Sequence, residues 1–196
     1  MSGYQFDFFI SYARRGTVQQ WLLNHFLRKL SDCLADQLAP TPRIYVDREM
    51  PRAVHWPSSL RHALKRSKIM IQLLNPQYFT SPWCLAEWHN MMERERVLGL
   101  ASLEKPQGLI YPILYSDSDN FPLEGKVRGW VNFKEFAYPD PVYQQTADFV
   151  RFHHAVNKMA ADLVALVQQV PPWQEDWPDV DPPDPVLAPT PPLPRF

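Results

Sequence analysis

The stretch that decides the fold is KIMIQLLNPQYFTSPWCLAE, residues 68–87. Its first part, residues 68–74, is a short apolar run typical of a buried strand. Ser81 is a preferred N-cap and Pro82 a preferred first helical residue, so a helix is predicted to begin there. In a fold that alternates strands and helices, the loop between a strand and its following helix lies at the carboxyl edge of the sheet, where such folds bind ligands.

Two side chains near the start of this helix suggest which ligand. Trp83 and Glu87 are four residues apart, so they lie on one helix face. An aromatic ring and a carboxylate at that edge suit a base and its ribose.

Further apolar runs predict the remaining elements. Strands are expected over residues 6–12, 43–46, 109–115 and, more weakly, 131–136, and helices over 17–38, from Pro57, from Ser81 and over 149–170. This alternation indicates a parallel sheet with helices on both faces. Residues 116–130 carry a proline and two glycines and give no confident prediction.

The whole chain has the length of one domain with a short appendage. Its 196 residues have a formal net charge of −1 and no run of Lys or Arg, so the basic patch of a nucleic-acid reader is missing. Neither a signal peptide nor an apolar stretch of membrane length is visible, and we therefore expect no membrane contact and a cytoplasmic location.

Cysteine and histidine give no sign of a metal or redox site. Cys33 and Cys84 fall on helical segments with apolar patterning, which favours buried reduced thiols over a disulfide or a nucleophile. The six histidines show no metal-ligand spacing with cysteines or acids, and no Ser/His/Asp order appears. We expect no metal.

The composition changes after Val170. Residues 171–196 are rich in proline and acidic side chains, which predicts a disordered linker or tail that contributes nothing to folding or chemistry. The domain is therefore expected to span residues 1–170, and the tail to lead to a sensor domain or protein.

Three motifs occur in an order found in a known family. They are F-D-F-F-I-S-Y-A-R-R from Phe6 to Arg15, I-Y-V-D-R-E-M-P-R-A-V-H-W-P from Ile44 to Pro57, and S-P-W-C-L-A-E from Ser81 to Glu87. Together they resemble the Toll/interleukin-1 receptor (TIR) domain family, and the Trp-Pro at the end of the second motif resembles bacterial members. One departure is Ala53, where family members often have Gly, a residue freer to adopt positive φ.

The resemblance implies a fold and two possible activities. The fold would be a flavodoxin-like three-layer sandwich, with a five-stranded parallel sheet and helices on both faces. Some TIR domains cleave NAD+, and others act only as adhesive modules. In TIR hydrolases the glutamate that matches Glu87 is the catalytic one.

Cleaving the bond between ribose and nicotinamide needs no strong nucleophile, because the sugar becomes oxocarbenium-like as the leaving group departs. Glu87 would stabilise that charge, and the alternative is a solvated glutamate near a helix N-terminus. Trp83 would stack on the substrate, and the alternative is a core tryptophan. Cys84, Leu85, Trp88, Met91 and Met92 fill the apolar side, which leaves Trp83 with Glu87, Asn90 and Arg94 on a more polar side.

The nucleotide would also meet groups from the first two strands. The resemblance places it beside Tyr12, Arg14 and Arg15, and side chains must hold any diphosphate because the chain has neither G-x-G-x-x-G nor a P-loop lysine. Their absence also argues against a dehydrogenase that keeps NAD as a cofactor. Asp47 either lines the site or caps a turn.

The sequence therefore favours an NAD+ hydrolase, or an enzyme that cyclises the ADP-ribose product, acting as an effector in bacterial anti-phage defence. It would use NAD+ as its substrate, need no cofactor and become active by self-assembly with other TIR domains. The exposed loop from Arg48 to Trp56 would mediate that association, through Arg48, Pro51, Arg52 and Trp56. The alternative is a non-catalytic TIR adaptor that acts only through TIR–TIR contacts.

Overall fold

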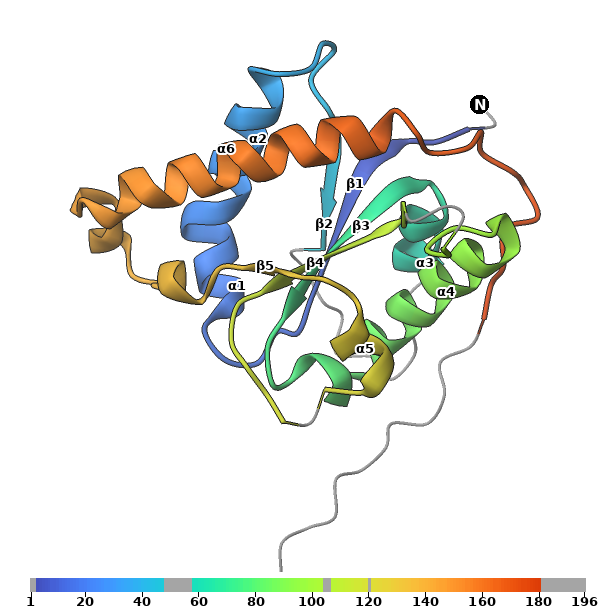
Figure 1. The fold of residues 1–196 in the computed structure, drawn as a ribbon, viewed down its shortest axis with the longest axis horizontal. Helices are drawn as coiled ribbons and strands as arrows, with labels where there is room; N and C mark the ends of the chain where they lie inside the picture. The colour runs from blue at the N-terminus through green and yellow to red at the C-terminus, as the bar shows by residue number, and fades with distance from the viewer. Residues whose placement is uncertain (1–2, 48–57, 104–106, 120, 181–196) are drawn as a thin grey trace, which may run out of the picture.

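The computed structural model describes residues 3–47, 58–103, 107–119 and 121–180. They form one parallel five-stranded sheet in the order β2-β1-β3-β4-β5 (Figure 1). The strands are β1 (Phe6–Tyr12), β2 (Ile44–Val46), β3 (Ser67–Leu74), β4 (Ile110–Leu114) and β5 (Val131–Asn132). This arrangement confirms the flavodoxin-like three-layer sandwich.

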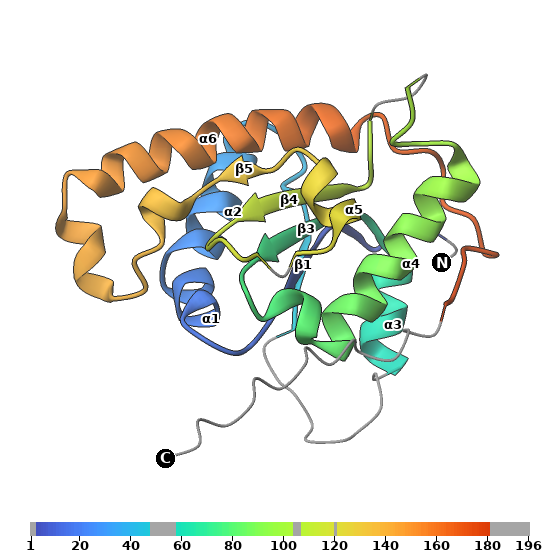
Figure 2. The same ribbon diagram turned by 60° about the horizontal axis from the view of Figure 1, so that its bottom comes forward.

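Helices cover both faces of the sheet (Figures 1 and 2). One face carries α1 (Val18–Trp21), α2 (Leu27–Ala35) and α6 (Asp148–Val167), and a π-helical turn over Leu22–Phe26 joins α1 to α2. The other face carries α3 (Ser58–Lys65) and α4 (Pro82–Leu98). The helix α5 (Leu123–Val127) lies within residues 116–130, where no element was predicted, and short 3-10 turns occupy Tyr78–Thr80, Lys134–Phe136 and Pro141–Gln145.

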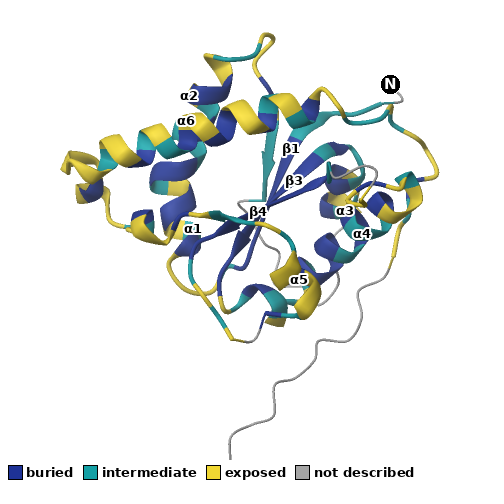
Figure 3. Ribbon diagram, viewed as in Figure 1, coloured by how far each residue is buried: buried dark blue, intermediate teal, exposed yellow. Residues whose placement is uncertain are grey.

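The core has two halves because successive side chains of a strand point to opposite faces. Along β1, Phe8, Ile10 and Tyr12 belong to the half under α1, α2 and α6. Phe9, just before Ile10, belongs to the half under α3 and α4. Both halves are buried, as the dark central strands in Figure 3 show, so the central strands β1, β3 and β4 read as largely apolar runs.

Residues 171–180 pack against the domain, although the sequence suggested a disordered tail from residue 171. This segment follows α6 and runs alongside α3 and α4 (Figure 1). Trp177 is only 3% exposed. The indole of Trp173 donates to the carbonyl of Lys65 at 3.2 Å. The prediction was wrong because it relied on the composition of the whole tail, which is dominated by proline and acidic residues. The two tryptophans supply the apolar surface through which residues 171–180 pack against the domain. Residues 181–196 lie outside the described part of the chain.

Some sequence expectations concern residues that the structure does not describe. Ala53 and the four proposed association residues, Arg48, Pro51, Arg52 and Trp56, fall in residues 48–57. Among the described helices, none has the length and apolar character needed to cross a membrane. Within the described ranges, no group of three or more His, Cys, Asp or Glu side chains could hold a metal ion.

Candidate functional site

A small pocket lies at the carboxyl edge of the sheet, beside β1, β2, α3 and the start of α4. Its volume is about 30 Å³. It is lined by Ile10, Tyr12, Arg14, Asp47, Leu60, Ser81, Trp83, Cys84 and Glu87. Five of the six residues expected at the site from sequence therefore meet here, and Arg15 does not.

The start of α4 sets the direction of two of these side chains. Ser81 is the N-cap, with extended backbone angles, and its hydroxyl accepts from the amide of Cys84 at 3.4 Å. Pro82 occupies the first turn, where its missing N–H costs nothing. Because the helix begins at this point, Trp83 and Glu87 lie on successive turns and both line the pocket.

Glu87 is buried rather than solvated, so the structure overturns the alternative of a solvated surface glutamate. Glu87 is only 6% exposed. The hydroxyl of Ser11 donates to Glu87 Oε2 at 2.5 Å, and among the described residues no group donates to Oε1. Burial raises the pKa of Glu87 to about 8, although the hydrogen bond from Ser11 pulls it down. Asp47 raises it further and Arg14 lowers it.

Arg14 and Asp47 form an ion pair at the mouth of the pocket. Arg14 Nη2 lies 2.9 Å from Asp47 Oδ2 and donates to the carbonyl of Asp47 at 3.0 Å. The hydroxyl of Tyr12 donates to the same carbonyl at 2.7 Å. Asp47 thus lines the pocket, the first of its two sequence interpretations.

Arg15 lies outside this cluster. Its side chain is exposed, and its carbonyl accepts from the side-chain amide of Asn75 at 3.3 Å. Among the described residues, the arginine beside Glu87 is therefore Arg14.

The polar side of α4 is buried, which the sequence did not predict. Asn90 and Arg94 are 4% and 2% exposed. Asn90 exchanges two hydrogen bonds with the backbone of Val180, at 2.7 and 2.8 Å. Arg94 donates to the carbonyls of Ser67 and Leu64. Trp83, one turn before Glu87, remains partly buried against the core beneath α3 and α4.

Sequence reasoning missed Ser11 and Tyr78. Ser11 is 1% exposed and Tyr78 is fully buried, and their hydroxyls lie 2.6 Å apart. A signal was present, because Ser11 is a polar residue between Phe9 and Ala13 on the face that β1 turns toward α3 and α4. Tyr78 carried no comparable signal, since a tyrosine after a strand is ordinary.

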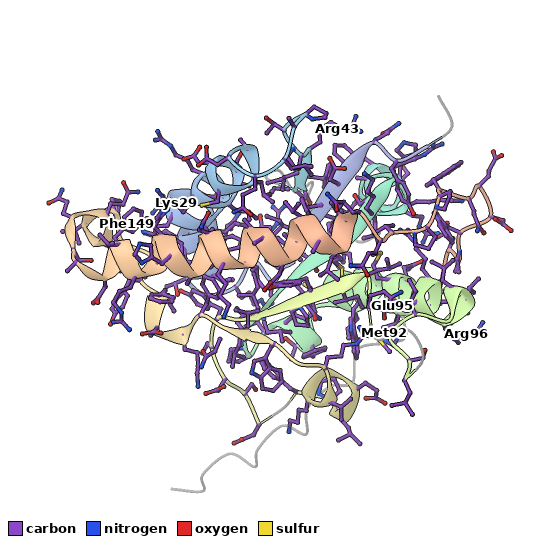
Figure 4. The ribbon with its side chains drawn as sticks, turned by 45° about the horizontal axis from the view of Figure 1, so that its top comes forward. Lys29, Arg43, Met92, Glu95, Arg96 and Phe149 are labelled. Atoms are coloured by element: carbon purple, nitrogen blue, oxygen red, sulfur yellow. The ribbon has the colours of Figure 1, made fainter. Side chains whose placement is uncertain are left out.

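A wider cavity, of about 680 Å³, lies elsewhere, against α4, β4 and α5. Met92 contributes to its wall, close to Glu95 on the same helix (Figure 4). Arg128, also in the wall, forms an ion pair with Glu95, and Glu95 Oε1 accepts from the amides of Leu109 and Ile110. These charges are already paired with each other and with the backbone, so we place the site at Glu87.

A comparison with known protein families identifies one match. The family model described as a TIR domain matches residues 8–145. A TIR domain of the Toll-related receptor TRR-2 from Hydra magnipapillata is similar at 17% identity and a TM-score of 0.44, covering 76% of this chain and 99% of its own. The TIR domains of the activated Roq1 resistosome, which recognizes the pathogen effector XopQ, are similar at 20% identity and a TM-score of 0.39, covering 84% and 96%. A search of curated proteins returned no match.

The parallel sheet, its strand order and the helices on both of its faces define an α/β domain of the flavodoxin-like class. The family match extends over most of that domain, and the chain belongs to the TIR domain family.

Proposed function

We propose that this TIR domain hydrolyses NAD+ at the bond between nicotinamide and ribose. The observation that carries the proposal is Glu87, a buried carboxyl group in a pocket at the ligand-binding edge, with Oε2 bonded to Ser11 and Oε1 left to face a substrate. Trp83 lies one turn away on the same pocket wall, where its ring can stack on the substrate.

The reaction depends on a negative charge close to the ribose and does not need a strong nucleophile. Nicotinamide leaves as a neutral molecule and takes the electrons of the C–N bond, so positive charge develops on the ribose ring. An ionised Glu87 would stabilise that charge. Water then adds its oxygen to the ribose carbon and releases a proton, which yields ADP-ribose. Attack by a group of the same ADP-ribose would give a cyclic product.

Arg14 would bind the negatively charged diphosphate of the substrate. It is the cation among the described residues that line the pocket, and the chain has no glycine-rich motif that would bind a diphosphate. A diphosphate would compete with the Asp47 carboxylate for the Arg14 guanidinium. The Arg14–Asp47 pair would therefore open as the nucleotide enters.

The pocket must also widen before substrate binds. A volume of about 30 Å³ holds about one water molecule. The half-buried Trp83 and the Arg14–Asp47 pair are the wall groups that would move. We propose that self-association with other TIR domains favours the open form, and that NAD+ depletion by the assembled form would make the protein an effector in bacterial defence.

The small pocket also favours a second candidate, a non-catalytic adaptor that acts through TIR–TIR contacts. In the closed form Glu87 is mostly protonated at neutral pH, because its pKa is about 8. A protein that only associates has no need to ionise this group. NAD+ cleavage distinguishes the two candidates.

The test is nicotinamide release from NAD+, measured by chromatography with the purified full chain over about a hundredfold range of protein concentration. We expect release, with a specific activity that rises with concentration. Glu87→Gln should lose about a hundredfold or more in kcat, because the charge acts on the transition state. Glu93→Gln, a matched control on the same helix whose partner is Arg96 at the surface, should keep full activity.

Two results would count against the hydrolase. One is a parent protein that releases no nicotinamide at any concentration while it forms assemblies, which would favour the adaptor. The other is a Glu87→Gln protein that keeps more than about a tenth of the parental kcat, which would place the catalytic charge elsewhere.

A further inference from the structure

A chain of two buried hydroxyl groups ends at Glu87. Tyr78 lies in the 3-10 turn after β3, Ser11 lies in β1, and Glu87 lies in α4. The Tyr78 and Ser11 oxygens are 2.6 Å apart, and Ser11 Oγ is 2.5 Å from Glu87 Oε2. Three elements that are distant in sequence therefore meet at one carboxyl group.

When Glu87 is ionised, the hydrogen bonds of this chain can run in one direction only. Ser11 has one hydroxyl proton and donates it to Glu87 Oε2. Ser11 can then only accept from Tyr78, so the proton between them comes from the tyrosine. Two O–H dipoles, those of Tyr78 and Ser11, therefore point toward the carboxylate of Glu87. Hydrogen bonds in such a chain polarise and so strengthen one another.

We infer that Ser11, supported by Tyr78, is a positioning residue that holds Oε2 of Glu87 and favours its ionised form, leaving Oε1 for the ribose. This inference rests on the proposed function for its catalytic meaning. Its physical content, the control of one carboxyl group by two hydroxyls, does not depend on which reaction follows.

Six other charged or titratable groups lie around Glu87 or interact with it electrostatically. They are Arg14, Tyr12, Tyr45, Asp47, Tyr78 and Cys84. Arg14 favours the ionised form of Glu87 and Asp47 opposes it, and the two are paired with each other, so their effects partly cancel. The pKa values of the three tyrosines and of Cys84 are raised by burial, so these groups remain uncharged at neutral pH.

Ser11 is thus the one neutral donor that contacts the carboxylate among the described residues. A buried carboxylate gains more from a hydrogen bond than an exposed one, because the low local dielectric weakens screening. The serine offsets part of the cost of charging Glu87.

The test compares two variants with matched controls. Ser11→Ala removes the donor, and Tyr78→Phe removes only the hydroxyl that supports it. Ser67→Ala is the control for the first, because Ser67 is a buried serine whose hydroxyl bonds to the carbonyl of Ala63. Tyr115→Phe is the control for the second, because the hydroxyl of Tyr115 bonds to Thr17 and not to Glu87.

The first readout is the titration of the Glu87 carboxyl carbon by NMR in the full chain, with the signal assigned by its loss in Glu87→Gln. Ser11→Ala should raise the pKa by about one unit, as expected for the loss of a charge-assisted hydrogen bond. Tyr78→Phe should raise it by about half a unit, since only the support is lost. Ser11→Thr, which keeps the hydroxyl, should restore the parental value, and both controls should leave it unchanged.

The second readout is the pH profile of NAD+ cleavage. With a pKa near 8, about a tenth of Glu87 is ionised at pH 7, and one unit more leaves about a hundredth. Ser11→Ala should therefore lower kcat/KM about tenfold at pH 7 and recover toward the parent above about pH 9. A loss of the same size at every pH would indicate a role in packing only.

The two readouts separate the failure of this inference from the failure of the proposed function. If neither variant moves the Glu87 titration relative to its control, the inference is overturned, whatever the activity. If the titration moves as expected in a protein that never cleaves NAD+, the hydroxyl chain stands and the hydrolase does not. If Ser11→Ala does not fold, Tyr78→Phe decides alone, and an unchanged titration in that variant overturns the inference.

Discussion

Glu87 combines two properties that oppose each other. It is 6% exposed, which disfavours its charge, and the hydroxyl of Ser11 contacts it, which favours the charge. Burial is the larger effect, so the pKa rises to about 8. Such a group is neutral in the closed pocket, and the positive nicotinamide ring of bound NAD+ would help to ionise it. Under the proposed function, substrate binding and the charge of Glu87 would therefore be linked.

This raised pKa has a consequence for stability. The unfolded carboxyl group titrates near 4.5 and the folded one near 8, so the folded state holds the proton more tightly. The stabilising contribution is complete below pH 4.5 and is lost as the pH rises through about 8. Glu87→Gln cannot titrate. We expect its unfolding free energy, relative to the parent, to increase from pH 5 to pH 9 by up to about 4 kcal/mol.

Urea denaturation of both proteins at pH 5 and pH 9 measures this difference. Glu93→Gln serves as the control, because Glu93 pairs with Arg96 at the surface and its pKa is lowered rather than raised. A Glu87→Gln advantage that is the same at both pH values would show that Glu87 is already ionised at pH 5, and the pocket would then be more open in solution than in the structure.

Helix α4 shows at the scale of an element what the sequence can predict. Its start was predictable, because Ser81 and Pro82 form a local signal, and so was the shared face of Trp83 and Glu87. The burial of Asn90 and Arg94 was not predictable, because their partners Val180 and Ser67 are distant in the chain. The contact between Ser11 and Glu87 was hidden for the same reason. Local patterning predicts elements, whereas the site depends on which elements meet.

The two tryptophans of α4 test how its faces are used. Trp88 is 3% exposed in the core, whereas Trp83 is partly buried at the pocket. We expect Trp88→Ala to lower the unfolding free energy by about 3 to 5 kcal/mol, the range for a buried aromatic. Trp83→Ala should cost less than about 3 kcal/mol, and it should raise KM for NAD+ because a stacking platform worth about 1 to 3 kcal/mol is lost.

Chemical denaturation of the two variants measures the loss of unfolding free energy, and steady-state kinetics measures KM for NAD+. Trp88→Ala is the comparison that matters, since it alters the same helix without touching the pocket lining. Equal losses of stability for the two variants would make Trp83 a core residue, and the stacking role would then have to be abandoned.

At the scale of the whole molecule, residues 171–180 tie two helices together. Trp173 bonds to the carbonyl of Lys65 at the end of α3, and Val180 bonds to Asn90 in α4. Asp179 pairs with Arg61 at 3.0 Å, and the guanidinium of Arg94 lies 5.1 Å from the ring of Trp177. Both helices also carry side chains that line the pocket, so this segment braces the scaffold of the site.

Truncation measures the contribution of this brace. A chain that ends at Val170 loses the buried Trp177 together with the hydrogen bonds of Trp173 and Val180. We expect its unfolding free energy to fall by about 3 kcal/mol or more, the cost of removing a buried tryptophan, and its melting temperature by roughly 6 to 12 °C. A chain that ends at Val180 keeps every one of these contacts, so its melting temperature should equal that of the full-length protein. Scanning calorimetry of the three chains compares them directly. If the chain that ends at Val170 had the same melting temperature as the full-length chain, residues 171–180 would contribute no net stability. The packing of Trp177 would then be a contact without energetic consequence.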